Sequence, residues 1–313
     1  MFAWGSWKTI LPLVLGIVGL IAFGLYSELL SKNPIIPLRI ITNRTAAINY
    51  FGMFIHGFVQ FGITFYLPLY YQGVKGYSPL IAGVAALPQC ATAGPSTAIT
   101  AALISKTHRL KIFSLIGWAI LVLGLGLFQD LNINTSVAAW IFLNVPSGVG
   151  IGILFSSVAL ATQNAAESTG TAEEVSQVKT MAACLNPFFR AIGQAVAIAV
   201  GQAAVDNQVK HRLGAAYGNQ LAGLAPLVKY LLPDQQAIVK QAFVDSLRVV
   251  WWVLFALAIS AGLLVSLTAD HRILVKPAQD GEKAIKVTDI GTPSSFEPVT
   301  DTEHVRPDSQ SAK

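Results

Sequence analysis

Long apolar runs, separated by short polar stretches, make up most of this chain. A membrane-spanning helix needs about 17 to 25 mainly apolar residues, and seven runs reach that length. The runs cover residues 9–26, 46–71, 78–104, 112–128, 137–162, 178–204 and 249–268. The pattern therefore predicts an all-α integral membrane protein with about seven transmembrane helices.

Composition also indicates a membrane protein. Of the 313 residues, 53% are hydrophobic and 12% are charged, whereas soluble domains carry about 25% charged residues. The stretch 269–313 mixes acidic and basic residues with many Pro, Ser and Thr, so we expect a disordered tail there. No small-residue cleavage site follows the first run, so we expect it to remain a membrane helix.

Lysine and arginine in the short loops predict the orientation, because they favour the cytoplasmic side. One side carries the larger set: Lys32, Arg39, Arg44, Lys106, Arg109, Lys111, Lys179, Arg272 and Lys276. The bias predicts an outer N-terminus and a cytoplasmic C-terminal tail. The loop at about 205–247 then lies outside, and Asp234 is a candidate N-cap for an amphipathic stretch within it.

Polar residues recur at helical spacing inside four of the runs, which places them on one face of each helix. These faces predict a bundle around a water-accessible cavity. The candidate substrate-pathway residues are Asn49, His56, Gln60, Gln89, Asn144, Arg190 and Gln194. The alternative, which stays open, is that such polar side chains only hydrogen-bond between packed helices.

Apart from Lys179 at its edge, Arg190 is the one charge inside the sixth run. In an unbroken helix it lies about 16 Å from Lys179, near the middle of the bilayer. If the helix began at Pro187, Arg190 would lie in the first turn and reach the lipid headgroups. We expect a continuous, kinked helix with Arg190 facing the bundle interior.

Acidic residues are absent from the seven runs. Proton-coupled transport usually depends on a titratable group inside the membrane, and only His56 titrates there near neutral pH. The sequence also lacks G-x-S-x-G, H-E-x-x-H, a phosphate-binding glycine loop and a Cys/His set with metal spacing. We therefore expect no enzyme activity, cofactor, metal site or nucleic-acid partner.

Several stretches carry a resemblance to a known family. Residues 5–23 read GSWKTILPLVLGIVGLIAF, and residues 34–88 read PIIPLRIITNRTAAINYFGMFIHGFVQFGITFYLPLYYQGVKGYSPLIAGVAALP. Later runs contain GWAILVLGLGLF, GVGIGILF and FFRAIGQAVAIAVG. Over residues 5–268 the chain resembles the fourteen-helix drug:proton antiporter branch of the major facilitator superfamily, and residues 34–88 are similar to fungal drug and toxin efflux pumps.

This resemblance implies the C-terminal half of a carrier that works by alternating access. Residues 1–41 would be an extra central helix with a cytoplasmic linker, 42–268 a six-helix C-terminal bundle, and 269–313 the tail. The implied activity is proton-coupled efflux of drugs, toxins or other small organic molecules across a lipid bilayer. The missing N-terminal half-bundle would come from the same gene or a partner chain. The implied location is the plasma membrane, with the vacuolar membrane as an alternative.

The segment LISKTHRLK between the third and fourth runs resembles a degenerate copy of the superfamily's basic loop. Its basic residues are Lys106, His108, Arg109 and Lys111. The usual glycine and acidic residue are missing, and Ala102 and His108 stand at the candidate positions. A gating role for this loop is therefore not supported by its sequence.

Three other interpretations were weighed. A siderophore (iron-chelate) carrier and a non-transporting truncated fragment both fit the same pattern. A seven-helix receptor shares the number of spans and the orientation. However, the sequence lacks the acidic-arginine-aromatic triplet, the N-P-x-x-Y turn and an outer-loop cysteine, which disfavours a receptor.

Overall fold

The structure is a computed structural model that describes residues 6–29, 44–165, 172–213 and 225–268. The chain divides into Met1–Ile273 and Leu274–Lys313, and the second unit lies outside the described residues. The tail expected to be disordered, residues 269–313, also lies outside the described residues. The expected boundary between residues 1–41 and the six-helix bundle stays a prediction.

The described residues contain helices and no strand. The α-helices are α1 (Trp7–Leu29), α3 (Arg44–Gly73), α4 (Pro79–Ala85), α5 (Leu87–Thr107), α6 (Leu110–Leu127), α7 (Val137–Ala165), α8 (Ala172–Leu213) and α10 (Pro233–Ser266). Two short 3-10 helices, η1 (Phe128–Asp130) and η2 (Ala225–Tyr230), complete the set.

Five helices are long and apolar enough to cross a membrane, namely α3, α6, α7, α8 and α10. α1 contributes a shorter apolar stretch, Ile10–Tyr26. α5 is 21 residues long but rich in Thr, Ser and Pro, which makes it less apolar. The all-α membrane fold is confirmed, and five of the seven expected spans meet both length and composition.

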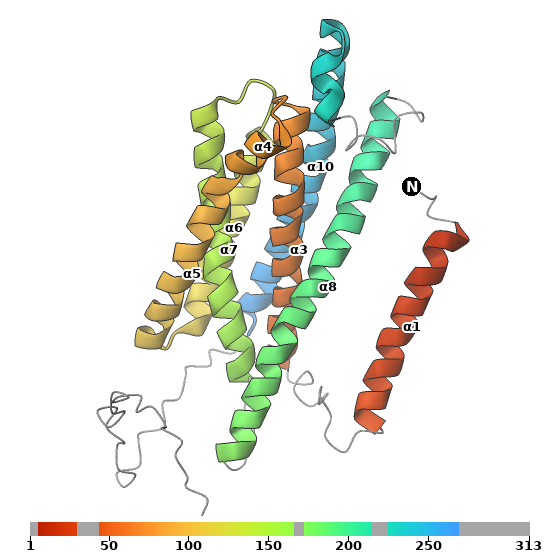
Figure 1. Cartoon of the computed structure of the whole chain (residues 1–313). Helices are drawn as coiled ribbons and strands as arrows, with labels where there is room; N and C mark the ends of the chain where they lie inside the picture. The colour runs from red at the N-terminus through yellow and green to blue at the C-terminus, as the bar shows by residue number, and fades with distance from the viewer. Residues whose placement is uncertain (1–5, 30–43, 166–171, 214–224, 269–313) are drawn as a thin grey trace, which may run out of the picture. The chain divides into compact units, whose positions relative to one another are not determined.

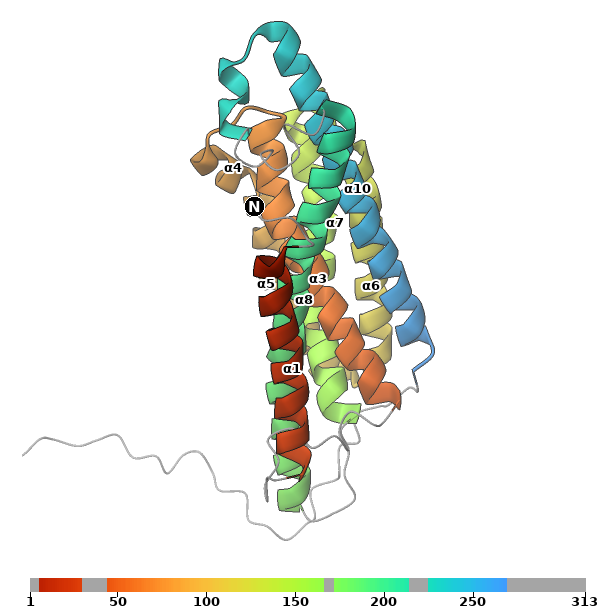
Figure 2. The same cartoon turned by 90° about the vertical axis from the view of Figure 1, so that its right-hand side faces the viewer.

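α3 is the most buried of these helices. It contacts α7, α8 and α10, while α7 also packs against α5 and α6, and α10 against α6 (Figures 1 and 2). Large side chains fill the space between the helices, and Tyr66, Trp118, Phe128 and Trp251 are almost fully buried. The buried polar residues on α3, Asn49 and His56, therefore meet other helices rather than lipid.

Glycines on α7 bring it into direct contact with α5. A Cβ at Gly148 or Gly152 would overlap a backbone carbonyl oxygen of α5. At this distance side chains bridge the two backbones, because Thr97 Oγ1 donates to the Gly152 carbonyl at 3.1 Å and Ser156 Oγ donates to the Thr97 carbonyl at 2.9 Å. The polar faces of α5 and α7 are thus packed against each other.

The third expected span, residues 78–104, is broken in two close to Pro88, one of the two prolines expected to interrupt it, whereas Pro95 lies inside α5. α4 ends and α5 begins at Ala86. Pro88 lies in the first turn of α5, where its missing N–H does no harm, whereas inside a longer helix it would remove a hydrogen bond. Ser78 caps α4 by accepting a hydrogen bond from the Ile81 N–H at 3.4 Å.

The expected outer loop at 205–247 is partly helical. α8 continues to Leu213, and α10 begins at Pro233 and runs without a break into the last span. The N-cap of α10 is Leu232, so the prediction of Asp234 as N-cap was wrong. Asp234 lies in the first turn instead, where its charge complements the helix dipole.

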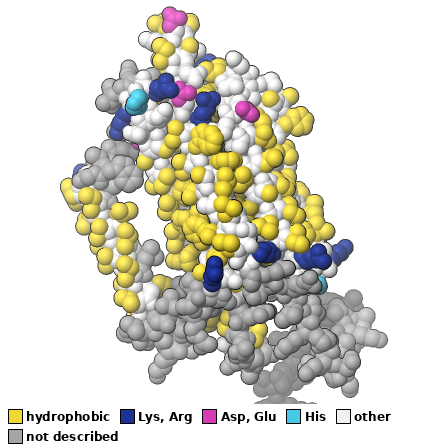
Figure 3. All heavy atoms as spheres, turned by 180° about the vertical axis from the view of Figure 1, so that it is seen from behind, with side chains coloured by type: hydrophobic (Ala, Val, Ile, Leu, Met, Phe, Trp, Pro, Cys, Tyr) yellow, Lys and Arg dark blue, Asp and Glu magenta, His cyan; other side chains and the backbone are white. Residues whose placement is uncertain are grey.

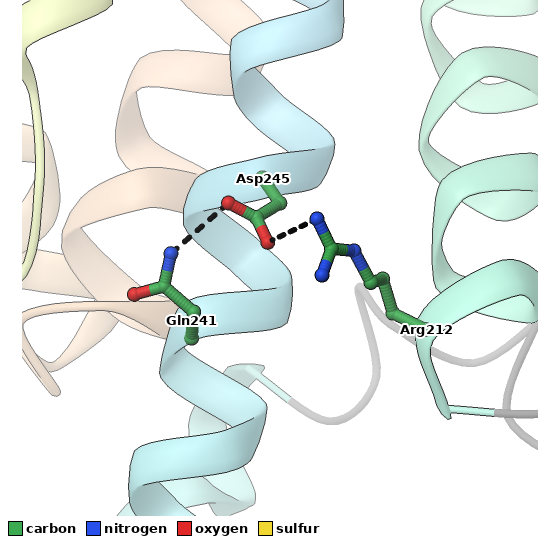
Figure 4. Close-up of polar contacts among 3 residues, drawn as sticks. All are labelled: Arg212, Gln241 and Asp245. Atoms are coloured by element: carbon green, nitrogen blue, oxygen red, sulfur yellow. Dashed lines mark hydrogen bonds and ion pairs between the residues drawn. The ribbon is translucent and has the colours of Figure 1, made fainter.

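Charged side chains gather at the two ends of the helices, and the band between them is hydrophobic (Figure 3). At the end where α8 finishes and α10 begins, Arg212 and Asp245 form an ion pair at 3.2 Å. Gln241 donates to the same carboxylate at 3.0 Å (Figure 4). Because the Arg212 side chain is 55% exposed, this pair contributes at most about 1 kcal/mol.

Candidate functional site

α8 carries Arg190 deep within its span. The helix runs unbroken through Pro187, which confirms the expected continuous helix. At 1.5 Å per residue, Arg190 lies about 16 Å from Lys179 and about 24 Å from Asp206. No other charged residue stands between those two. The guanidinium is therefore far from both charged ends of the helix.

The Arg190 guanidinium lies over the ring of Phe155 on α7. The distance from Cζ to the ring centroid is 4.9 Å, which is within the range of a cation–π interaction. Among the described residues, the guanidinium has no hydrogen-bond or ion-pair partner. Phe155 is 40% exposed, so this pair lies at a surface of the helix packing and not in its core.

Close contact between α3 and α8 sets the position of Arg190. A Cβ at Gly57 on α3 would overlap the Arg190 carbonyl oxygen, and a Cβ at Gly193 would overlap the Phe54 carbonyl oxygen. The two helices therefore touch through their backbones at Arg190 and again one turn further along α8. This contact limits how far α8 can rotate and directs the arginine toward α7.

His56 is fully buried between α3 and α7. Its Nε2–H donates to the carbonyl of Ile151 at 3.1 Å, so Nε2 carries the hydrogen. The imidazole and Phe155 ring centroids are 6.2 Å apart. Nδ1 is buried and has no partner among the described residues. His56 thus belongs to the same group of side chains as Phe155 and Arg190.

Gln60 and Gln194 stand one helical turn beyond His56 and Arg190. Both are half-buried. The Oε1 atom of Gln60 is buried without a hydrogen-bond partner in the described part of the chain. Their positions extend the polar face toward the end at which α3 finishes.

A set of hydrogen bonds between helices lies one helical turn before Arg190, on the side away from Gln194. Thr162 Oγ1 on α7 donates to Asn186 Oδ1 on α8 at 2.7 Å. Asn186 Nδ2 donates in turn to the Ala159 carbonyl at 3.3 Å. Tyr50 on α3 also donates to the Ala182 carbonyl at 3.3 Å. These bonds hold α3, α7 and α8 together beside the arginine.

The other three pathway candidates lie elsewhere. Asn144 is fully buried and donates to the Tyr71 hydroxyl at 2.7 Å. Gln89 is buried at the start of α5. Asn49 lines a small pocket at the opposite end with Lys111, and the Ser114 hydroxyl there has no partner among the described residues. The structure therefore groups four of the seven candidates and separates these three.

The basic segment forms the tight turn between α5 and α6. His108 adopts a left-handed conformation with φ 56° and caps α5 through its N–H to the Ile104 carbonyl at 2.8 Å. Lys106 lies in the last turn of α5, where a cation complements the helix dipole. Lys111 donates to the Thr268 carbonyl after α10, and Arg109 is exposed. These side chains are accounted for by turn formation and by contact with α10.

Sequence reasoning missed Phe155. The candidate pathway residue in the fifth run was Asn144, and Phe155 lies three turns further along the same helix. Helical spacing does not show which aromatic residue meets an arginine on another helix, so no sequence signal singles out Phe155.

No protein-family model matches the chain. Individual proteins, however, match it over most of its length. MFS transporter L2 of Phoma sp. is 34% identical over 283 residues, which cover 86% of this chain and 45% of that protein. The efflux pump dotC of Dothistroma septosporum is 33% identical over 289 residues, covering 87% of this chain and 48% of that protein. The chain belongs to the major facilitator superfamily.

A third superfamily relative is the acurin A biosynthesis cluster MFS-type transporter of Aspergillus aculeatus. It is 30% identical over 277 residues, covering 86% of this chain and 50% of that protein. The chain thus spans about half the length of the curated relatives it matches. These names describe transporters, not enzymes, and all three proteins are fungal. The resemblance seen in the sequence is confirmed.

Proposed function

We propose that this chain is the C-terminal half of an efflux carrier for small organic molecules that works by alternating access. The observation that carries the proposal is the match to proteins named efflux pumps or MFS transporters over more than four-fifths of the chain and about half of each relative. The group formed by His56, Phe155 and Arg190 supports it, because intramembrane polar and charged residues commonly mark transport pathways.

We propose further that His56, Gln60, Arg190 and Gln194 line the substrate pathway. The other three candidates, Asn49, Gln89 and Asn144, would instead form contacts between helices that change during the transport cycle. Their burial in this structure favours such contacts over direct contact with substrate.

Proton coupling belongs to the same proposal. The described carboxylates Asp130, Asp206, Asp234 and Asp245 all lie on the parts of their helices nearest one end. The coupling acid is therefore expected in the missing half-bundle, which a partner chain or the same gene would supply. The plasma membrane, with a cytoplasmic C-terminus, is the proposed location.

Transport by inside-out yeast membrane vesicles tests this function. The chain is expressed alone and together with the part of Phoma MFS transporter L2 that the match leaves out. The fluorescent probes are rhodamine 6G, a cation, and carboxyfluorescein, an anion. We expect uptake of at least one probe above that of vesicles without the chain, and its loss on addition of a protonophore.

The control is the Gly193→Leu variant, whose side chain would separate α3 from α8. It should reach the membrane at a reduced level and show no uptake per molecule. If uptake of both probes stays at the level of vesicles without the chain, with and without the added part of the Phoma transporter, the chain is a non-transporting fragment instead.

A further inference from the structure

Arg190 is a cation for which the described residues supply no anion. The acidic side chains that the structure describes lie toward the far ends of their helices. Asp206 accepts a hydrogen bond from Gln202 at 2.7 Å, and Asp245 pairs with Arg212 at 3.2 Å. Charged residues at membrane depth are normally paired or face water. The positive charge of Arg190 therefore remains unneutralised in this part of the molecule.

The arginine is nevertheless held in a fixed orientation. Its Cζ atom lies over the Phe155 ring, 4.9 Å from the ring centroid. Its backbone is fixed by the contact with Gly57. A guanidinium carries five N–H donors around its edge, and among the described residues the Arg190 guanidinium has no hydrogen-bond or ion-pair partner. An arginine in this position can bind a carboxylate through two parallel hydrogen bonds.

The surroundings suit the rest of an organic molecule. Phe155 is 40% exposed and offers aromatic surface beside the cation. The buried Nδ1 of His56 and Oε1 of Gln60 lack partners among the described residues. Both atoms belong to side chains on the adjacent face of α3, so further polar groups are within the same region.

We propose that Arg190 and Phe155 form a binding site for organic anions that carry a carboxylate next to a flat aromatic body. This inference rests on the proposed function and names the class of substrate. The carboxylate takes the free edge of the Arg190 guanidinium, and the aromatic body packs against Phe155. Because Arg190 is only half-buried and Phe155 is 40% exposed, a mobile ligand can reach this surface.

Equilibrium binding tests the site without transport. The full chain is placed in nanodiscs of phosphatidylcholine, which carries no net charge, at pH 7.5. The probe is radiolabelled 1-naphthoate, and the comparison ligand is 1-naphthamide, which has the same ring system but no charge. We expect naphthoate to bind at least about tenfold more tightly than naphthamide, because only the carboxylate is oppositely charged and offers two acceptor oxygens to the guanidinium.

Four variants locate the site, and one of them is a control. Arg190→Gln should weaken naphthoate binding about tenfold or more and leave naphthamide unchanged. Arg190→Lys keeps the charge but loses the planar fork, so its loss should be smaller. Arg212→Gln removes an arginine from the same helix far from Phe155 and should have no effect. Phe155→Leu should weaken both ligands, because the aromatic surface is common to them.

Equal affinity for acid and amide would overturn the proposal. So would naphthoate binding that Arg190→Gln leaves intact while the variant elutes as a folded monodisperse protein. Arg190 would then find its counter-charge in an acidic side chain outside the described residues. Binding with the expected pattern in a chain that moves neither fluorescent probe would leave the anion site standing and reject the transport function alone.

Discussion

Gly193 is the residue at which α3 and α8 come closest beside Arg190. A Cβ there would overlap the Phe54 carbonyl oxygen, and a backbone group cannot move aside as a flexible side chain can. We expect Gly193→Ala to lower the free energy of unfolding by about 1 to 3 kcal/mol, the usual cost of overpacking. Thermal unfolding in detergent measures it.

The matched control is Gly94→Ala on α5, where nothing lies within 4 Å of the added Cβ. Alanine is the better helix former by about 1 kcal/mol, so this variant should be as stable as the native chain or more so. Equal effects of the two substitutions would contradict the close contact of α3 with α8.

Thr162 supplies the donor of the hydrogen bond that joins α7 to α8. Thr162→Val keeps the shape but leaves Asn186 Oδ1 without that donor. We expect a loss of about 0.6 to 1.7 kcal/mol, the range measured for hydrogen bonds between membrane helices. Unfolding in mixed micelles of increasing SDS content measures it.

Thr180→Val provides the comparison, because Thr180 is exposed and bonds only within its own helix, to the Ser176 carbonyl at 2.9 Å. It should change stability by less than about 0.5 kcal/mol. A Thr180 effect as large as that of Thr162 would mean that the interhelical bond contributes nothing specific.

At the scale of one residue, sequence reasoning found Arg190 but not its partner. A charge in an apolar run is conspicuous in any sequence, whereas Phe155 is one of 16 phenylalanines. Which aromatic ring meets the guanidinium depends on the rotation of α7 against α8. That rotation is set by contacts such as Gly57 against Arg190, and helical spacing alone does not specify them.

Among the elements, the apolar runs predicted the helices well wherever hydrophobicity was continuous. The run 46–71 became Arg44–Gly73, and 137–162 became Val137–Ala165. The predicted bounds were wrong where a helix is longer or shorter than its apolar run. α10 begins in a polar stretch that was predicted as a separate amphipathic segment. α4 ends inside an apolar run, just before Pro88 in the first turn of α5.

α10 leads to a prediction of its own. Its 34 residues extend about 51 Å, whereas the hydrocarbon core is about 30 Å thick. Its first turns, at residues 233–239, are mostly exposed and should therefore lie in water. They should exchange amide hydrogens faster than residues 250–261 in the apolar part of the helix, which include the buried Trp251 and Leu254. Hydrogen exchange followed by mass spectrometry in nanodiscs measures both segments. Equal protection along the helix would contradict this placement.

For the whole molecule, the sequence predicted the family better than it predicted the arrangement of the pathway residues. The family resemblance agrees with the relatives, of which the chain covers about half the length. The arrangement of the pathway residues was harder to predict. Helical spacing put seven of them on polar faces, but the structure gives Asn144 a buried partner in Tyr71 and leaves Arg190 beside Phe155. Polar spacing shows which residues share a face and does not show whether another helix already covers it.

The orientation of the molecule gives the last prediction. The turn between α5 and α6 carries Lys106, Arg109 and Lys111, and positively charged short loops favour the cytoplasmic side. Ser105 and Ser136 are exposed near opposite ends of the helices. In a chain with both native cysteines replaced by alanine, Ser136→Cys should react with a membrane-impermeant maleimide added to intact cells. Ser105→Cys should react only after the cells are opened, and the reverse pattern would place the basic turn outside and reject the proposed cytoplasmic C-terminus.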